Sequence, residues 1–194
     1  MTAQLADKQQ ALGPVTVEDW LAADTPDDGS RLELLLGYFK MTPPATSGHQ
    51  RASFRLARAI DNGLVAAGLA GLEVLQDVGV RISTPFRTAL IPDLVIVKVG
   101  DSRPAFEPAD VLLAAEIWSP GNRRTERETK IAAYAEAAIP YLWLVETPLG
   151  KPVSFRGYRL EEADYVQVVH AEAGETITMA AGPVPVKIDT SELC

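Results

Sequence analysis

Cysteine and histidine are scarce in this sequence, which has one cysteine, Cys194, and two histidines, His49 and His170, among 194 residues. A single cysteine cannot form an intramolecular disulfide, so a disulfide framework is excluded. The same scarcity argues against a zinc site, which is built mainly from cysteine and histidine ligands. Hydrophobic residues make up 47% of the chain, so a core can be buried without disulfides or structural metals.

Long apolar runs are also missing. No stretch approaches the roughly 18 unbroken apolar residues of a membrane-spanning helix. The first residues, MTAQLADKQQ, lack the basic start and apolar run of a secretory signal. We therefore expect a cytoplasmic protein that does not associate with membranes.

Basic residues are outnumbered, with 18 Lys and Arg against 26 Asp and Glu, which gives a net charge of −8. A protein that grips DNA through many phosphates usually carries a basic face, and this chain has no such excess. No stretch suggests the interleaved aromatic and basic residues of single-strand binding. An acidic balance is still compatible with a catalytic cleft, because such a cleft must hold divalent cations.

The chain reads as one domain over residues 15–194, after a flexible tail over residues 1–14. Hydrophobic periodicity predicts helices over 17–23, 49–69 and 125–138, and a hairpin of strands over 32–36 and 38–42. Further strands are expected over 72–76, 78–83, 94–97, 111–117 and 141–145, and as short pieces within 153–188. This order predicts an α/β (α+β) fold with a mixed central sheet flanked by helices, an N-terminal hairpin and a C-terminal β extension.

Three charged residues stand beside apolar segments. Asp93 enters the strand of LIPDLVIV, Glu116 lies near the end of VLLAAEIW, and Lys130 lies on the following helix. A carboxylate at the end of an apolar strand is costly unless it is paired or binds a metal. Two carboxylates on neighbouring strands can face one Mg²⁺, which acidifies a water for attack on a phosphodiester. A nearby lysine can orient that water or stabilise the developing charge.

Structural explanations exist for the same residues. Asp93 can be a turn residue after Pro92, and Glu116 can form a buried salt bridge with Lys130 or Arg123. Each residue alone is a weak signal, so the argument depends on the whole arrangement.

That arrangement resembles a known group of enzymes. The order P-D, apolar strand, E-I-x-S-P, basic loop and K-x-x-x-Y is similar to the PD-(D/E)-x-K nuclease superfamily, and more narrowly to its bacterial restriction-endonuclease-like family. The most specific matching stretch is residues 115–145. The resemblance implies a restriction-endonuclease-like core and Asp93, Glu116 and Ile117 as ligands of Mg²⁺ or Mn²⁺. It also implies that the catalytic lysine has moved from the strand, where Trp118 stands, to Lys130 on the helix.

The resemblance extends to the N-terminal half. Glu33 matches the glutamate of the family's hairpin, which implies a place near the metal and a catalytic role. His49 matches a histidine that often precedes the first long helix; alternatively, it is a helix-start residue that contacts the backbone. The chain departs from the family pattern E-L-x-D-G-E, because Leu36 and Tyr38 replace two acids.

A group of arginines follows the proposed catalytic strand. Arg123, Arg124 and Arg127 could meet DNA phosphates from the start of their helix, or they could form a solvated helix face. We expect DNA as the partner. We also expect a homodimer, because a nuclease that cuts two strands needs two sites.

Three functions remain open at this point. The first is a metal-dependent nuclease that hydrolyses DNA phosphodiester bonds. The second is an inactive nuclease-fold module that binds DNA or a protein, which the altered hairpin and the acidic charge motivate. The third is a small-molecule hydrolase that uses Asp93 and Glu116 as acid and base.

Overall fold

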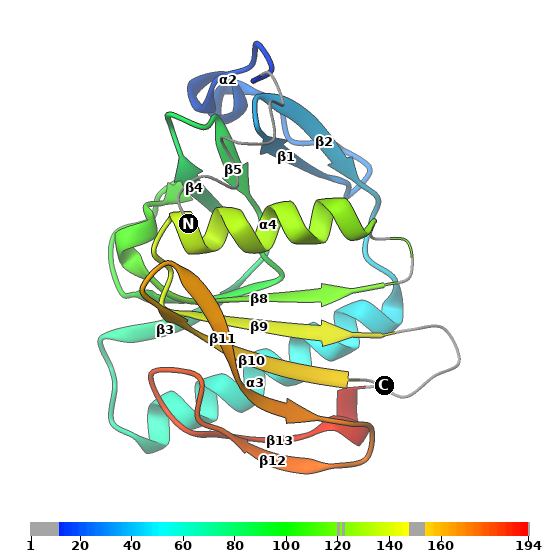
Figure 1. Ribbon diagram of the computed structural model, residues 1–194, viewed down its shortest axis with the longest axis vertical. Coiled ribbons are helices and arrows are strands. Elements are labelled where there is room, and N and C mark those ends of the chain that lie inside the picture. Colours follow the sequence, from blue (N-terminus) through cyan, green and yellow to red (C-terminus); the bar gives the residue numbers. More distant parts are fainter. Residues whose placement is uncertain (1–11, 120, 122, 148–153, 194) are drawn as a thin grey trace.

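A six-stranded mixed β-sheet forms the centre of the protein (Figure 1). The computed structural model describes residues 12–119, 121, 123–147 and 154–193. The strands of this sheet are β3 Leu72–Gln76, β6 Leu94–Lys98, β8 Val111–Trp118, β9 Tyr141–Glu146, β10 Ser154–Glu161 and β11 Asp164–Ala171. They lie in the order β11-β10-β9-β8-β6-β3, with β8 and β9 parallel and the other neighbours antiparallel. The predicted mixed central sheet is therefore confirmed.

A second sheet of five strands contains the predicted hairpin. Its strands are β1 Arg31–Leu35, β2 Tyr38–Thr42, β4 Gly79–Ser83, β5 Thr88–Leu90 and β7 Ala105–Phe106. They lie in the order β2-β1-β5-β4-β7, so β2 is an edge strand. β5 and β7 were not predicted, because strands of three and two residues are too short to show an alternating pattern. A separate pair, β12 Thr176–Met179 and β13 Val186–Asp189, completes the expected C-terminal β extension.

The three predicted helices are present in the described part of the chain. They are α2 Val17–Ala22, α3 Ser47–Ala66 and α4 Arg124–Glu136, with 3₁₀ turns at Pro108–Asp110 and Thr190–Leu193. α2 starts at a capping box, in which Thr16 and Asp19 satisfy each other's backbone N–H groups. None of the described helices is both long and apolar enough to cross a membrane.

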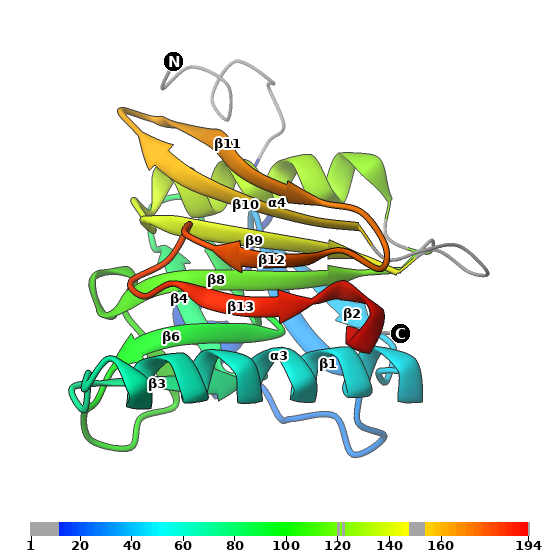
Figure 2. The same cartoon turned by 90° about the horizontal axis from the view of Figure 1, so that it is seen from below.

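The two faces of the central sheet are covered by different elements. On β8, Ala115 and Ile117 pack toward α3 and the β12–β13 pair, whereas Ala114 and Trp118 pack toward α4 and the smaller sheet. Figure 2 shows α3 and β13 on one side of the sheet and α4 on the other. Because side chains alternate along a strand, Glu116 falls on the α4 face.

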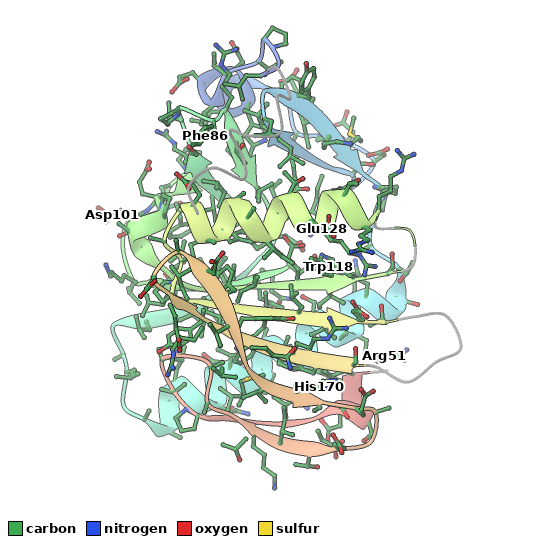
Figure 3. All side chains as sticks on the ribbon, in the orientation of Figure 1. Arg51, Phe86, Asp101, Trp118, Glu128 and His170 are labelled. Carbon is green, nitrogen blue, oxygen red and sulfur yellow. The ribbon has the colours of Figure 1, made fainter. Side chains whose placement is uncertain are left out.

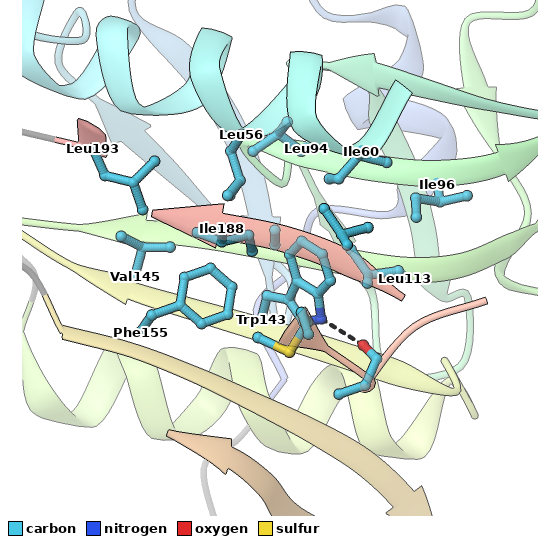
Figure 4. Close-up of a cluster of buried hydrophobic side chains, with 14 of the residues drawn as sticks. Leu56, Ile60, Leu94, Ile96, Leu113, Trp143, Val145, Phe155, Ile188 and Leu193 are labelled. Atoms are coloured by element: carbon cyan, nitrogen blue, oxygen red, sulfur yellow. Dashed lines mark hydrogen bonds between the residues drawn. The ribbon is translucent and has the colours of Figure 1, made fainter. Parts of the chain in front are cut away.

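The α3 face is closed by a dense aromatic and aliphatic core (Figure 4). Trp143 and Phe155 are fully buried, with an edge-to-face contact between ring centroids 5.4 Å apart. The Trp143 indole N–H donates to the Ala181 carbonyl, so the polar atom of this large side chain is satisfied. Leu56 and Ile60 of α3 pack into the same cluster. This core packs β6 and β8, the strands next to Asp93 and Glu116, against α3.

The hairpin turn is held against the segment that precedes α2. The Gly13 N–H donates to the Leu36 carbonyl at 2.8 Å, and Arg87 donates to the Gly13 carbonyl at 2.6 Å. A Cβ on Gly37 would lie 2.3 Å from the Gly13 carbonyl oxygen, so the two backbones touch directly. Most of the tail expected over residues 1–14 lies outside the described residues. Gly13 itself is part of the packed domain rather than loose.

α3 and α4 end in the same way but with different residues. After α4, Ala138 adopts φ 55°, and the Ile139 and Ala138 N–H groups donate to the carbonyls of Tyr134 and Ala135. After α3, Gly68 adopts φ 68° with the equivalent pair of hydrogen bonds. This is a Schellman motif, and it ends α4 two residues before the predicted end at Ala138.

The two helix ends predict a matched pair of stability changes. Ala138→Gly should raise the free energy of unfolding by about 0.5–1 kcal/mol, because a left-handed alanine is strained and glycine is not. Gly68→Ala should lower it by a similar amount, since no atom lies within 4 Å of the new Cβ and only backbone strain is added. Urea unfolding of both variants measures the effect. Equal shifts of the same sign would contradict this account.

Candidate active site

A cleft of about 360 Å³ lies where the β1–β2 hairpin, the start of α3, the end of β8 and α4 meet. All four residues predicted to be catalytic line it, as does His49: Glu33, His49, Asp93, Glu116 and Lys130. The three carboxylates are only 2–4% exposed and Lys130 is 8% exposed. Charged residues are almost never this buried unless they are paired. Each of these four side chains should therefore have a charged or hydrogen-bonding partner inside the cleft.

The strand pairing brings the two predicted metal ligands together. Leu94 of β6 pairs with Ala115 of β8, so Asp93 and Glu116 lie side by side at the same end of the strand pair. The Ile117 N–H donates to Asp93 Oδ2 at 2.6 Å, which fixes the aspartate against β8. Strand pairing therefore brings two carboxylates that are distant in the sequence to the same end of the β6–β8 pair.

Asp93 is held by two further donors on its other oxygen. Arg31 Nη1 lies 2.6 Å and His49 Nε2 lies 3.2 Å from Asp93 Oδ1. Burial alone would raise the pKa of Asp93, but the hydrogen bond from His49 and the charges of Arg31 and His49 outweigh it and lower the pKa. Burial also opposes the charged form of His49, whereas its hydrogen bond to Asp93 and the aspartate charge raise the pKa of the imidazole. Arg31 and His49 thus favour the ionised form of Asp93.

Glu116 is held differently. Tyr134 Oη donates to Glu116 Oε1 at 2.6 Å, and Lys130 Nζ lies 3.3 Å from the same oxygen. Burial raises the pKa of Glu116 to about 7; Lys130 opposes this rise, and the charges of Asp93 and Glu33 add to it. Both donors use Oε1, so Oε2 accepts no hydrogen bond from the described residues.

Lys130 joins the cleft to the hairpin. Its Nζ donates to Glu33 Oε1 at 2.9 Å, and that oxygen also accepts from the Ile91 N–H at 2.9 Å. Burial favours the neutral amine, but the charges of Glu116 and Glu33 prevail and raise the pKa of Lys130. The lysine is therefore a permanent cation and hydrogen-bond donor. Glu33 positions both this lysine and the segment that leads into Asp93.

The position of a strand lysine in the wider superfamily is filled here by an aromatic ring. Trp118 is labelled on β8 in Figure 3, beside α4. It lies on the same face of β8 as Glu116, is 5% exposed and also lines the cleft. The guanidinium of Arg127 lies 4.8 Å from its ring centroid. Lys130 reaches Glu116 from α4 instead, which is the arrangement that the resemblance implied.

The donor set fits a hard divalent ion better than a zinc cage. In the part of the chain that the structure describes, no group of three or more His, Cys, Asp or Glu side chains is arranged to hold a metal. Mg²⁺ commonly uses one or two carboxylates and keeps water and substrate phosphate as its other ligands. Asp93 and the Oε2 side of Glu116 offer that set. Ile117 could add only its main-chain carbonyl, because its side chain has no ligand atom.

The predicted DNA-binding arginines are not in this cleft. Arg124 is 90% exposed and pairs with Glu128 at 2.8 Å. Arg127 pairs with Glu146 at 3.3 Å in addition to covering Trp118. Arg123 precedes α4 and lines a neighbouring hollow. Contact of these arginines with DNA remains a prediction, and Arg127 has a clear structural role.

Two functional contacts were missed at the sequence level. Arg31 binds Asp93 and also Asp77 at 2.8 Å, yet a single arginine at the start of a strand gives no signal. Tyr134 belongs to the K-x-x-x-Y pattern, but we assigned it no role. Its position one helical turn after Lys130 could have indicated it, because residues four apart share a helix face.

Comparisons with known proteins identify the family and the fold. The family model Uma2, described as "Putative restriction endonuclease", matches residues 17–187. A solved structure from Anabaena variabilis ATCC 29413, described as a putative nuclease belonging to DUF820, has 15% sequence identity and a TM-score of 0.70. The similarity covers 93% of this chain and 97% of that one, so the two share a fold. No curated protein matches the chain.

The family match spans α2 through β13 and includes every residue of the charged cleft described above. The predicted restriction-endonuclease-like fold class is therefore confirmed, and the chain belongs to the Uma2 family of putative restriction endonucleases.

Proposed function

We propose that the protein is a divalent-metal-dependent nuclease that hydrolyses phosphodiester bonds of DNA. The observation that carries the proposal is the convergence of Asp93, Glu116 and Lys130 on one cleft, with all three side chains buried. Burial of three charged side chains lowers the stability of a domain unless they are well paired, so such clusters are uncommon in ordinary cores. Titratable groups with shifted pKa values in a cleft are typical of catalytic sites.

Each residue has a distinct task. Asp93 and Glu116, with the Ile117 carbonyl, would hold Mg²⁺ or Mn²⁺, and the bound ion would supply an acidified water and neutralise phosphate charge. Lys130 stays protonated, so it orients water or stabilises charge by donating hydrogen bonds and does not act as a base. Tyr134 and Glu33 fix Glu116 and Lys130 in place.

The departures from the family hairpin lie away from these groups. Leu36 is in the turn at φ 52°, and Tyr38 begins β2 with its side chain 49% exposed. Neither lines the catalytic cleft. This placement favours an active enzyme over an inactive binding module. The inactive module would be supported if the following experiments found neither metal binding nor cleavage.

Metal binding is expected to stabilise the folded protein. Mg²⁺ or Mn²⁺ should raise the unfolding temperature of the wild type, because a ligand that binds only the folded state adds about 2.7 kcal/mol at 100 times its Kd. Asp93→Asn and Glu116→Gln should abolish the rise. Asp110→Asn removes a carboxylate outside the cleft and should leave the rise unchanged. A wild type that does not respond to either metal would overturn the proposed ion site.

Substitution of Lys130 is expected to separate catalysis from metal binding. Lys130→Met should lower the rate of DNA cleavage by about 10²–10³, the usual effect of losing one charge-stabilising donor. Metal-induced stabilisation should persist, since both carboxylates remain. Single-turnover cleavage and thermal unfolding measure the two effects, and circular dichroism checks the fold. Cleavage at the wild-type rate would exclude Lys130 from the reaction.

The same cluster predicts a pH dependence of stability in the presence of EDTA. The pKa of Glu116 is raised from 4.5 to about 7 in the folded protein, so the folded state binds a proton that the unfolded state has lost. The contribution of this proton to the free energy of unfolding is full below about pH 4.5 and is lost as pH rises through 7.

Glu116→Gln should remove that loss. Relative to wild type, the variant should gain on the order of 3 kcal/mol in unfolding free energy between pH 5 and pH 8. Glu136→Gln, which removes an exposed carboxylate on α4, should follow the wild-type pH profile. Denaturant unfolding at the two pH values makes the comparison. A constant difference between wild type and Glu116→Gln would show that Glu116 is ionised throughout.

A further inference from the structure

The outer face of α3 carries two large hydrophobic side chains that their own domain leaves uncovered. Phe54 is 59% exposed and Val65 is 73% exposed. Leu56, Ile60 and Leu64 of the same helix are buried in the core beside the central sheet, so Phe54 and Val65 lie on the opposite side of the helix. Single exposed hydrophobic residues are common, so the meaning of these two depends on the residues between them.

Two opposite charges lie between the hydrophobic side chains. Arg58 and Asp61 are both exposed. Arg58 Nη2 lies 4.0 Å from Glu192 Oε2 of the C-terminal 3₁₀ turn, and both side chains of this pair are more than half exposed. An exposed pair at that distance contributes little to stability, so Arg58 can exchange Glu192 for a closer partner at little cost.

The residues Phe54, Arg58, Asp61 and Val65 form one stripe along the helix, which we call the α3 stripe. Their spacing along the chain is four, three and four residues, and at about 3.6 residues per turn this spacing keeps them on one side of the helix. The same spacing defines the a and d positions of a heptad, the seam along which two helices pack side by side. α3 therefore has a helix-packing seam that faces away from its own sheet.

The α3 stripe is complementary to itself when two copies of the helix run antiparallel. A twofold axis midway between Arg58 and Asp61 sets Phe54 opposite Val65 of the second copy. The same axis sets Arg58 opposite Asp61 of the second copy. Each contact occurs twice, because a twofold interface uses the same patch on both subunits. All four residues of the stripe thus meet a partner of matching chemistry.

We propose that the α3 stripe is the interface of a homodimer in which the α3 helices of two copies pack antiparallel. The inference does not depend on the proposed nuclease function, because it is built on the outer surface of α3 alone. His49, near the start of α3, lines the catalytic cleft. The dimer would therefore carry one cleft at each end of the helix pair, and a rise of about 1.5 Å per residue sets them about 30 Å apart along the helix axes.

Other arrangements of the same two helices fit less well. Parallel helices would set Arg58 opposite its own copy and Asp61 opposite its own copy, and like charges across an interface are costly. An antiparallel pair shifted by one heptad would set Asp61 opposite Val65, so that a carboxylate would lose water without gaining a partner. Charged residues at a and d positions commonly fix the register in this way.

The expected dimer is weak. One helix from each copy buries less surface than the interface of a permanent dimer, so the Kd should lie in the micromolar range. A net charge of −8 on each copy also opposes association at long range. This repulsion is largely screened at 0.15 M salt, where the Debye length is about 8 Å.

Analytical ultracentrifugation in EDTA at 0.15 M salt, over the micromolar range of concentrations, tests the interface. Arg58→Asp would set two carboxylates opposite each other, and Asp61→Arg would set two guanidinium groups opposite each other. Each single variant should weaken the dimer about tenfold or more. The double variant Arg58→Asp, Asp61→Arg restores the ion pair with its charges exchanged, so its Kd should return to within about threefold of the wild type.

A second pair of variants tests the hydrophobic contact. Phe54→Ser should weaken the dimer about tenfold, because each interface loses two buried phenylalanine rings. Val168→Ser is the matched control, since Val168 is 41% exposed on the edge strand β11 and lies outside the α3 stripe. It should associate like the wild type. Circular dichroism verifies that every variant keeps its fold.

Several results would overturn the proposal. The first is a wild type that stays monomeric throughout, and the second is a double variant that is no tighter than Arg58→Asp alone. A dimer that survives Phe54→Ser but dissociates in Val168→Ser would instead assign the contact to pairing of β11 edges. A monomeric wild type whose affinity for a DNA duplex falls in Arg58→Asp would assign the face to nucleic acid. Failure of the nuclease function would look different, because an inactive protein would still form the dimer in EDTA.

Discussion

The interaction on which the site depends is the buried ammonium of Lys130 between two carboxylates from separate sheets. Glu33 comes from the hairpin sheet and Glu116 from the central sheet, and Lys130 Nζ lies 2.9 Å from Glu33 Oε1 and 3.3 Å from Glu116 Oε1. Asp93, the third buried carboxylate, pairs with Arg31 instead. Removal of Lys130 would leave two carboxylates from separate sheets buried without their cation, which is strongly destabilising.

The local sequence was sufficient to predict the site residues that are charged but lie within or beside apolar segments. Asp93 stands at the entry of one apolar strand, Glu116 near the end of another, and Lys130 just before a run of alanines, so each was visible before the fold was known. Arg31 was not, because polar residues at the start of a half-buried strand are common. Tyr134 was hidden for the opposite reason, since an aromatic residue on a helix usually means core packing.

The fold was predictable to a similar degree and for similar reasons. Long periodic segments such as α3 and α4 were recognised, whereas the short strand β5 was not, because its register depends on β1 and β4 rather than on its own pattern. The end of α4 also depended on tertiary context, since alanine at position 138 gives no sign of a left-handed turn. Surfaces made from distant segments, such as the cleft between the β1–β2 hairpin and α4, are the hardest to see in a linear sequence.

The backbone contact between Gly13 and Gly37 has a consequence for how this sequence can vary. The contact lies outside the charged motifs, yet it anchors the turn of the hairpin that carries Glu33. A methyl group at either glycine would overlap the backbone of the other, so the turn of the hairpin would have to shift. Packing therefore restricts which residues can replace these two glycines, although neither of them lines the charged cleft.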